Sequence, residues 1–428
     1  MVDKVKEEKI IFYEVLRWFL LASVVGLLSG LVVAGFIALL DWGTTYSGKF
    51  THYFWLAPIL FVLNLLLIKY VAPDASGHGT EKVIEAVHNR SGKIRLAVVP
   101  IKLATTWFTL ISGGSVGKEG PSAQMGGGLS SFMADILKFS DDDRKKLVIC
   151  GISAGFAAIF GTPISGAVFG IEVLFVGVML YDVLLPSIVA GITAYYVTDL
   201  FGVPRPHFDV DFTGGINEYI ILKVAIAGIV FGLCAFLFIE TMNKVERLAR
   251  NLKVHFVIKG LIGGAIIILV GTLFGKDSLG LGTETITNIF KGTEIVWYLF
   301  LLKIVLTAVT LNFGGSGGVV TPVFFVGATV GALLGQLTGN DPMLFAAIGL
   351  VAVLGGATNA PIAACIMGIE LFGETVAPYA SLACIISFLI TGNRSIYPTQ
   401  ILAMKKANHL SVVLGREIKK LDGSPDDG

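Results

Sequence analysis

The most regular feature of the sequence is a series of long apolar runs separated by short polar stretches. The runs cover roughly residues 20–40, 54–71, 220–239, 256–274 and 297–311. An α-helix needs about 20 predominantly apolar residues to cross a bilayer. The pattern therefore predicts an all-α, polytopic membrane protein.

Other apolar segments are too short to cross a bilayer, and each is bounded by Gly, Pro, Thr or Asn. They cover residues 147–160, 164–175, 348–356 and 362–372. Interrupted helices at membrane depth are tolerated only where they are buried in protein or line a cavity. We therefore expect many short, broken helices inside a larger bundle.

Three sequence signatures occur twice, in the same order and about 200 residues apart. Such an echo is typical of a duplicated unit. In membrane proteins, duplicated broken helices point to a substrate site where the two halves meet. The sequence thus predicts two inverted structural repeats. The pairs are Gly77-His-Gly-Thr-Glu81 with Gly280-Leu-Gly-Thr-Glu284, Gly114-Ser-Val-Gly-Lys-Glu-Gly-Pro121 with Gly314-Gly-Ser-Gly-Gly-Val-Val-Thr-Pro322, and Phe169-Gly-Ile-Glu172 with Met367-Gly-Ile-Glu370.

Polar segments set the expected domain boundaries. The N-terminus mixes lysines with apolar residues, as in a helix that lies on the membrane surface, and a Pro/Gly-rich loop separates the halves. Basic residues near both ends favour cytoplasmic termini in a multi-pass plasma-membrane protein. The predicted divisions are an interfacial amphipathic helix at 1–18, a first membrane repeat at 19–203, a connecting loop at 204–217, a second membrane repeat at 218–400 and a short cytoplasmic tail at 401–428.

Composition supports the membrane class and argues against several others. Of the 428 residues, 54% are hydrophobic and 15% charged, against about 25% charged in soluble domains. A net charge of +1 gives no sign of nucleic-acid binding. The four cysteines stand singly, so neither a metal site nor a disulfide framework is expected. The six histidines are dispersed and no nucleophile motif appears, so we expect no enzyme and no cofactor, and a membrane enzyme or scaffold is the weakest alternative.

Three Gly-rich breaks, at 77–79, 117–121 and 317–322, each precede an apolar segment. A helix N-terminus carries unpaired N–H groups and a partial positive charge. Glycine lets these amides approach an ion closely, and proline suits the first helical turn. Several such N-termini converging at one point predict a binding site for an anion.

Glu119 is an unusual residue for its surroundings, since it lies among glycines beside an apolar segment. An ionisable residue within the membrane is expensive and marks a functional site by default. At a helix N-terminus its carboxylate could occupy the place of an anion and leave on protonation. The alternative is a capping glutamate at the membrane surface. Its neighbour Lys118 is either a partner on the solvent side or a lysine that extends toward the interface.

These motifs resemble those of the CLC family of chloride channels and chloride/proton antiporters over about residues 20–400. Gly117-Lys-Glu-Gly-Pro121 matches that family's G(K/R)EGP signature, which implies that Glu119 is the external gating glutamate. Gly318-Val-Val-Thr-Pro322 stands at the GxFxP signature, and Tyr397 fits the late anion-coordinating tyrosine. The resemblance implies an anion-binding set of Gly77, His78, Gly79, Gly117, Lys118, Gly120, Gly318, Val319, Val320, Thr321 and Tyr397, with the amides of Val319 and Val320 facing the anion.

The first departure from the family pattern is His78, which stands where the family usually has the central serine of GSGIP. The duplicate carries Leu281 at this place, so the motif itself does not require histidine. An imidazole N–H could donate to an anion, more strongly when protonated. The alternative is a histidine hydrogen-bonded to a nearby carbonyl group.

The second departure is Val173, at the place of the internal proton glutamate of antiporter members. Glu172 and Glu370 remain in both halves, which favours a structural role for them over proton transfer. Loss of the internal glutamate occurs in channel-type members and in the fluoride-exporting branch, which residues 148–200 and 346–400 resemble most. That branch typically has an acidic residue where this chain has Val319.

The resemblance implies CLC-type transport of a halide across the lipid bilayer by a homodimer, with one pathway per subunit. We expect chloride first and fluoride second, gated by Glu119 and exchanged for protons. A passive voltage- or pH-gated chloride channel and a fluoride/proton antiporter are the alternatives.

Overall fold

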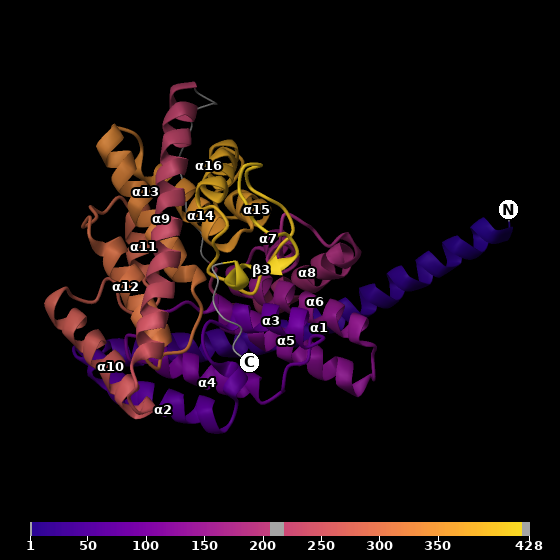
Figure 1. Cartoon of the computed structure of the whole chain (residues 1–428), viewed down its shortest axis with the longest axis horizontal. Coiled ribbons are helices and arrows are strands. Elements are labelled where there is room, and N and C mark those ends of the chain that lie inside the picture. Colours follow the sequence, from indigo (N-terminus) through magenta and orange to yellow (C-terminus); the bar gives the residue numbers. More distant parts are fainter. Residues whose placement is uncertain (1, 206–217, 422–428) are drawn as a thin grey trace.

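The structure is a computed structural model that describes residues 2–205 and 218–421, and it is largely helical. The connecting loop predicted at 204–217 therefore lies, from residue 206 onward, outside the described residues. So does the end of the tail predicted at 401–428. Figure 1 shows the helices gathered in one body, from which the N-terminal helix projects.

The described α-helices form two consecutive sets of eight, and each helix of the first set has a counterpart at the same place in the second. The first set comprises α1 (Val2–Gly48), α2 (Ala57–Tyr70), α3 (Gly79–Asn89), α4 (Val98–Ile111), α5 (Glu119–Ile136), α6 (Asp141–Phe160), α7 (Pro163–Glu172) and α8 (Leu184–Leu200). The second set comprises α9 (Glu218–Asn251), α10 (Phe256–Leu273), α11 (Thr283–Phe290), α12 (Leu299–Asn312), α13 (Val320–Thr338), α14 (Pro342–Thr358), α15 (Pro361–Phe372) and α16 (Ala377–Ile390). This arrangement confirms the predicted fold class of inverted repeats with short, broken helices.

Helix lengths follow the apolar pattern of the sequence. Six helical segments are long and apolar enough to cross a membrane among the described residues. Five shorter apolar helices accompany them, namely α4, α12, α14, α15 and α16. Two of these short helices, α14 and α15, begin at a proline, as does α7. Proline has no N–H to lose at the first helical position, so the sequence sets these starting points.

The N-terminal helix differs from the expected interfacial element. The sequence predicts an interfacial amphipathic helix at 1–18, but the described residues from Val2 onward belong to one helix, α1, that extends to Gly48. No glycine or proline occurs before Gly26 in this stretch, so nothing in the sequence breaks the helix. The first part of α1 projects from the body in Figure 1 and exposes Ile10, Phe12 and Phe19.

Glycines bring the central helices of each repeat into backbone contact. A methyl group at Gly126 of α5 would collide with the carbonyl oxygen of Gly151 in α6. In the second repeat a methyl group at Gly327 of α13 would collide in the same way with that of Gly349 in α14. Small residues allow such close approach of membrane helices, so the duplicated glycines fix the same helix pair in both halves.

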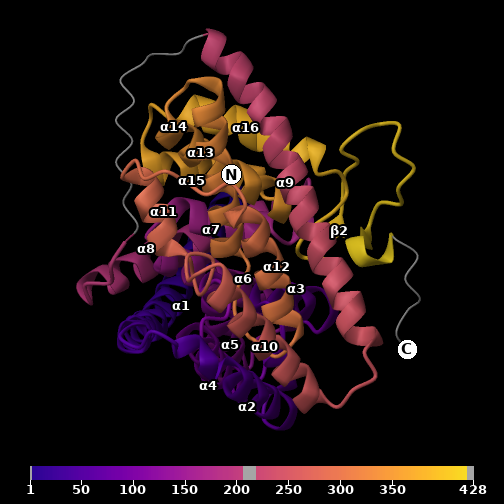
Figure 2. The same cartoon turned by 90° about the vertical axis from the view of Figure 1, so that its left-hand side faces the viewer.

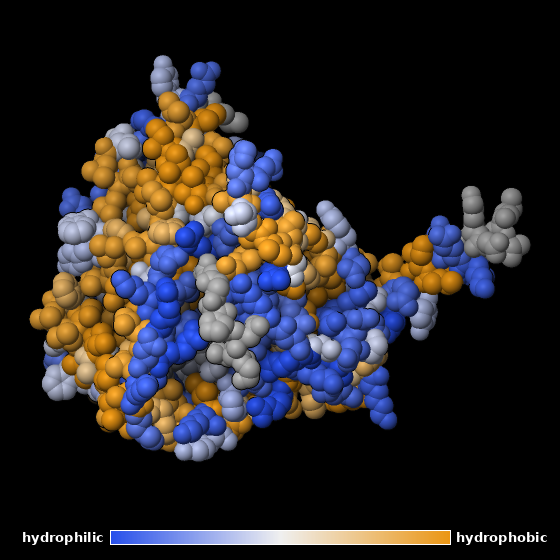
Figure 3. Space-filling model, in the orientation of Figure 1, coloured by the Kyte–Doolittle hydropathy of each residue, from blue (hydrophilic) through white to orange (hydrophobic). Residues whose placement is uncertain are grey.

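A small sheet ties the C-terminal segment to the first repeat. Strand β2 (Ile401–Leu402) pairs in parallel with β1 (Phe175–Val176) and antiparallel with β3 (Arg416–Glu417). Figure 2 shows the C-terminal segment, in yellow, beside the helical body. Hydrophobic residues cover the surface over the upper part of α9 and over α10 in Figure 3, while hydrophilic residues gather over the lower part of α9 and near the C-terminal segment. The remaining short elements are the 3₁₀ turns η1 (Tyr53–Leu56), η2 (Pro73–Ala75), η3 (Tyr181–Val183) and η4 (Ile418–Lys420).

Candidate anion site

The N-termini of α3, α5 and α13 meet at one point between the repeats. Two antiparallel hydrogen bonds join the breaks that precede α5 and α13: Gly117 N–H donates to Gly318 O at 2.7 Å, and Gly318 N–H donates to Gly117 O at 2.6 Å. A second bridge joins His78, before α3, to Gly317. The three Gly-rich breaks predicted from the sequence are therefore in direct backbone contact.

Glycine is required at this meeting point by space. A Cβ atom on Gly120 would lie 3.1 Å from Gly318 Cα and 3.3 Å from Gly79 N. A Cβ atom on Gly79 would in turn collide with the carbonyl oxygen of Gly120. Gly77 adopts a left-handed conformation with φ of 68°, which glycine tolerates best. These predicted residues thus lie together, with helix N-termini directed toward one region.

Glu119 lies in the centre of this arrangement with only 1% of its surface exposed. The backbone N–H of Thr321 donates to its Oε2 at 3.2 Å, and the Thr321 hydroxyl donates to its Oε1. The alternative of a capping glutamate at the membrane surface does not fit this burial. The carboxylate instead takes an N–H group at the start of α13, as an inorganic anion would.

The remaining predicted residues of α5 and α13 surround this carboxylate. Lys118 is the N-cap residue of α5 and is half-buried, while Val319 is the N-cap residue of α13. Val319 and Val320 are both buried. The resemblance implied that their amides face the anion. In this structure the amide one residue further on, that of Thr321, donates to the carboxylate of Glu119.

His78 and Tyr397 lie side by side, with ring centroids 5.8 Å apart. Within the described residues, neither His78 Nδ1 nor the Tyr397 hydroxyl has a hydrogen-bond partner, and the hydroxyl of Thr80 has none either. Buried polar groups are nearly always paired. Tyr397, whose match to the family signature is loose, therefore lies beside His78. The unpaired polar groups of both side chains are available to bind a polar ligand.

Two buried lysines, Lys102 and Lys303, are not among the residues predicted from the sequence. Lys102 Nζ donates to the carbonyl groups of Gly77 (2.5 Å) and Ala75 (3.1 Å). Lys303 Nζ donates in the same way to Gly280 (2.8 Å) and Ser278 (3.2 Å). Each lysine therefore holds the loop of its own repeat's Gly-x-Gly-Thr-Glu motif. A signal was present, since each is an isolated cation in an apolar run about 200 residues from the other.

Glu172 and Glu370 cap helices of the opposite repeat. Glu172, at the end of α7, accepts from the N–H groups of Ile362 (3.1 Å) and Ala363 (2.8 Å) at the start of α15. Glu370, in α15, accepts from those of Ile164 (2.9 Å) and Ser165 (2.8 Å) at the start of α7. Their preservation in both halves thus has a structural explanation, because each carboxylate pairs orphan N–H groups.

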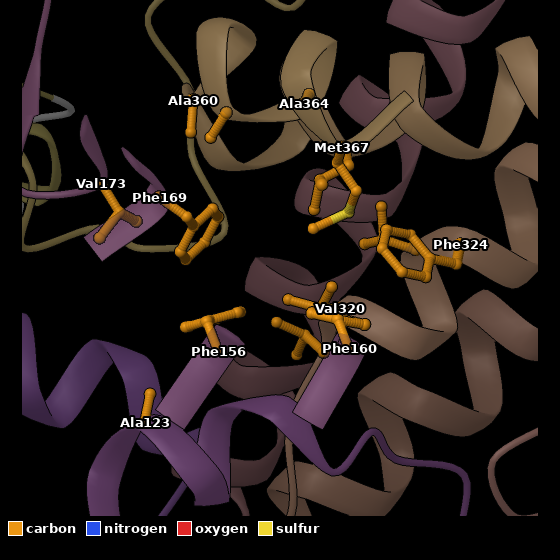
Figure 4. Packing of buried hydrophobic residues seen from close by; sticks show 14 of the residues in the cluster. Ala123, Phe156, Phe160, Phe169, Val173, Val320, Phe324, Ala360, Ala364 and Met367 are labelled. Atoms are coloured by element: carbon orange, nitrogen blue, oxygen red, sulfur yellow. The ribbon is translucent and has the colours of Figure 1, made fainter. Parts of the chain in front are cut away.

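The helix that carries Glu119 continues into an apolar cluster. Ala123 lies one turn beyond Glu119 on the same face of α5. Figure 4 shows it with Phe156, Phe169 and Val173, which belong to the same buried hydrophobic cluster. All four residues are buried. The place of the internal glutamate thus holds an apolar side chain, that of Val173.

Comparison with known proteins gives one consistent result. Residues 59–392 match the family described as voltage gated chloride channel. A chloride/fluoride channel protein of Pseudomonas syringae pv. tomato is 36% identical over 392 residues, which are 90% of this chain and 86% of that protein. A crystal structure of a CLC-type fluoride/proton antiporter is 29% identical with a TM-score of 0.87, covering 91% of this chain and 98% of its own.

A slow cyanobacterial Cl⁻/H⁺ antiporter has the same fold, with a TM-score of 0.78 at 22% identity over 88% of this chain and 94% of its own. The family match covers most of the chain, and the duplicated helices and their Gly-rich N-termini agree with it. The chain therefore belongs to the voltage-gated chloride channel (CLC) family and is a multi-pass membrane protein of anion transport.

Proposed function

We propose that this protein exchanges a halide for protons, with Glu119 as the gate and fluoride as the preferred anion. The observation that carries the proposal is the Glu119 carboxylate at the start of α13, held by the N–H and hydroxyl groups of Thr321. An anion and this carboxylate would compete for the same donors. Protonation of Glu119 would remove its charge and release the place to the anion.

We infer that the protein prefers fluoride to chloride, which reverses the order of preference expected from the sequence. A small, strongly hydrated anion needs strong donors close by to replace its water. His78 and Tyr397 offer unpaired buried groups beside three helix N-termini. Two of the similar proteins carry fluoride in their names, one as a chloride/fluoride channel protein and one as a fluoride/proton antiporter. Chloride is the second candidate.

We further infer the anion-binding set from this geometry. It comprises Gly77, His78, Gly79, Gly117, Lys118, Gly120, Gly318, Val319, Val320, Thr321 and Tyr397. The protein would act as a homodimer in the plasma membrane with both termini in the cytoplasm, and it would have no enzymatic activity. The domain boundaries at 19–203 and 218–400 would separate its two membrane repeats.

Flux measurements on purified protein in liposomes test this proposal. Equal potassium and valinomycin hold the voltage near zero while a fluoride or chloride gradient is imposed. A fluoride electrode and an internal pH dye then follow both ions together. Uphill proton movement driven by the anion gradient is the expected result, faster with fluoride. Anion efflux without proton movement would instead make the protein a passive channel.

Neutralising the proposed gate separates proton movement from anion movement. Glu119→Gln keeps the size of the side chain and an acceptor for Thr321 N–H but cannot release a proton. We expect proton movement to fall to the background of empty liposomes while anion efflux continues. Glu374→Gln, at an exposed position, serves as the control. Proton coupling that survives in Glu119→Gln would contradict the gate assignment.

A further inference from the structure

Apolar side chains stand where the internal glutamate would be. Val173 occupies its place, and Ala123, Phe156 and Phe169 are buried in the same apolar cluster (Figure 4). None of these four side chains can bind a proton. A proton that reaches Glu119 therefore needs polar groups elsewhere beside the site.

The first turn of α3 offers such groups. Within the described residues, four buried polar atoms here lack a hydrogen-bond partner: Nδ1 of His78, Oγ1 of Thr80, Oε2 of Glu81 and the hydroxyl of Tyr397. The hydroxyls of Thr80 and Tyr397 interact with one another, although within the described residues neither forms a hydrogen bond. Both Glu81 and Glu119 are near enough to Tyr397 to interact electrostatically with its hydroxyl. Unpaired groups of this kind are the usual partners of buried water.

Glu81 connects this group to the C-terminal segment. Its Oε1 accepts from the backbone N–H of Thr399 at 3.1 Å. Among the charged side chains, Lys82 on α3 and Lys419 on η4 interact electrostatically with it. The other end of α3 is joined to the same segment, because Asn89 donates to Glu417 at 2.8 Å. Glu81 thus lies between the central site and the C-terminal side of the molecule.

We propose that Glu81 is the proton acceptor on the C-terminal side and replaces the internal glutamate that this chain lacks at Val173. This inference rests on the proposed proton exchange. Glu81 takes a proton from water on the side of Lys82 and Lys419. The proton then passes through water held by Thr80 and Tyr397 to the Glu119 carboxylate, and Glu81 returns to its carboxylate form. Glu119 later releases the proton on the opposite side.

The duplicated motif supplies a matched control for this role. Glu284 is the counterpart of Glu81 in the second repeat, but its side chain is exposed. Glu81→Gln retains an oxygen that accepts from Thr399 N–H but cannot carry a proton. We expect Glu81→Gln to reduce the number of protons moved per anion at least tenfold with anion efflux retained. Glu284→Gln and Glu81→Asp should keep the coupling of the unchanged protein.

Two outcomes would overturn the proposal. One is an unchanged proton-to-anion ratio in Glu81→Gln. The other is loss of anion efflux when Glu81→Gln is added to Glu119→Gln, because Glu81 would then act by fixing the Tyr397 loop. Failure of the proposed function looks different, since the unchanged protein itself would then move no protons.

Discussion

Around Glu119, a carboxylate and an anion would be bound by the same kind of group. The carboxylate takes the N–H of Thr321, and unpaired donors of His78 and Tyr397 lie nearby. Neutral donors and helix N-termini bind an anion without a full opposite charge, which allows release as well as binding. The site therefore depends on the number and direction of its donors.

Replacing His78 tests whether its ring contacts the anion. His78→Ser restores the residue usual in the resembling family and shortens the donor. We expect the preference for fluoride over chloride to fall about tenfold, the effect of losing ~1.4 kcal/mol of differential binding. The ratio of the efflux rates of the two anions from liposomes, each followed with an electrode selective for that anion, measures it. An unchanged ratio would assign His78 a purely structural role.

The two buried lysines allow a paired comparison. Lys102→Met and Lys303→Met each remove a cation that holds two loop carbonyl groups. Lys102 holds the loop of His78, so its loss should weaken anion binding by about tenfold. At an effective dielectric constant of about 20, a charge about 10 Å away contributes ~1.7 kcal/mol. Lys303→Met should weaken binding far less. Equal effects in calorimetric titration with fluoride would contradict this difference.

Among the individual residues of the site, the sequence predicted that the glycines, Glu119 and Tyr397 would be neighbours. It did not predict a place there for Lys102, Lys303 or Glu81. Glycine motifs report on local backbone geometry, which a sequence signature records directly. Lys102 and Lys303 are visible in the sequence as isolated cations in apolar runs, but the loops that they hold are not, because those contacts join residues distant in the sequence. The same applies to the contact of Glu81 with Thr399. The amide that binds Glu119 also differed by one position from expectation, because a motif does not determine which N–H points inward.

At the scale of helices, α7 and α15 are linked because each carries a glutamate that caps the N-terminus of the other. Each helix ends near a carboxylate that pairs with the other helix's first N–H groups. An unpaired buried N–H costs about 1–3 kcal/mol. The two short helices therefore stabilise each other, which compensates for their lack of length.

Substitution of one cap should destabilise both repeats. Glu172→Gln leaves a single acceptor oxygen for the two N–H groups of α15. We expect a loss of about 1–3 kcal/mol in unfolding free energy, seen as a thermal midpoint lower by several degrees in detergent. Proton coupling should persist. Glu374→Gln is the exposed control, and loss of coupling in an otherwise stable Glu172→Gln would indicate proton transfer instead.

The helix pattern was largely predictable because apolar length and Gly/Pro punctuation determine where a membrane helix can begin and end. The continuation of 1–18 into α1 was not, since an amphipathic start reads the same whether or not the helix continues. The small sheet of β1, β2 and β3 was also unforeseen. Its strands have two residues each, too few to leave a periodic pattern.

For the molecule as a whole, Glu370 bears on the question of a second copy. This half-buried carboxylate accepts from the backbone N–H of Ile164 at the start of α7, and the side chains of Ile164 and of the adjacent Ile369 are exposed. A carboxylate facing lipid is costly, whereas a protein surface would shield it. We therefore expect this face to be covered by a second copy of the chain.

A bulky residue on that face tests the expectation. If the face is an interface between two copies, Ile369→Trp in α15 should yield a monomer where the unchanged protein is a dimer, as measured by light scattering in detergent. Ile226→Trp is the control, because this residue of α9 is equally apolar and exposed on another helix. A dimer that survives Ile369→Trp but not Ile226→Trp would place the interface on α9.

The duplicated Gly-x-Gly-Thr-Glu motif has different side chains and different surroundings in the two repeats. In the first repeat it carries His78, beside Tyr397, and Glu81, which accepts from Thr399 N–H, whereas in the second it carries Leu281 and exposes Glu284. With the roles proposed for His78 and Glu81, only the first copy takes part in the chemistry, and the second serves as structural support. We therefore expect two similar halves to carry a single, directional route.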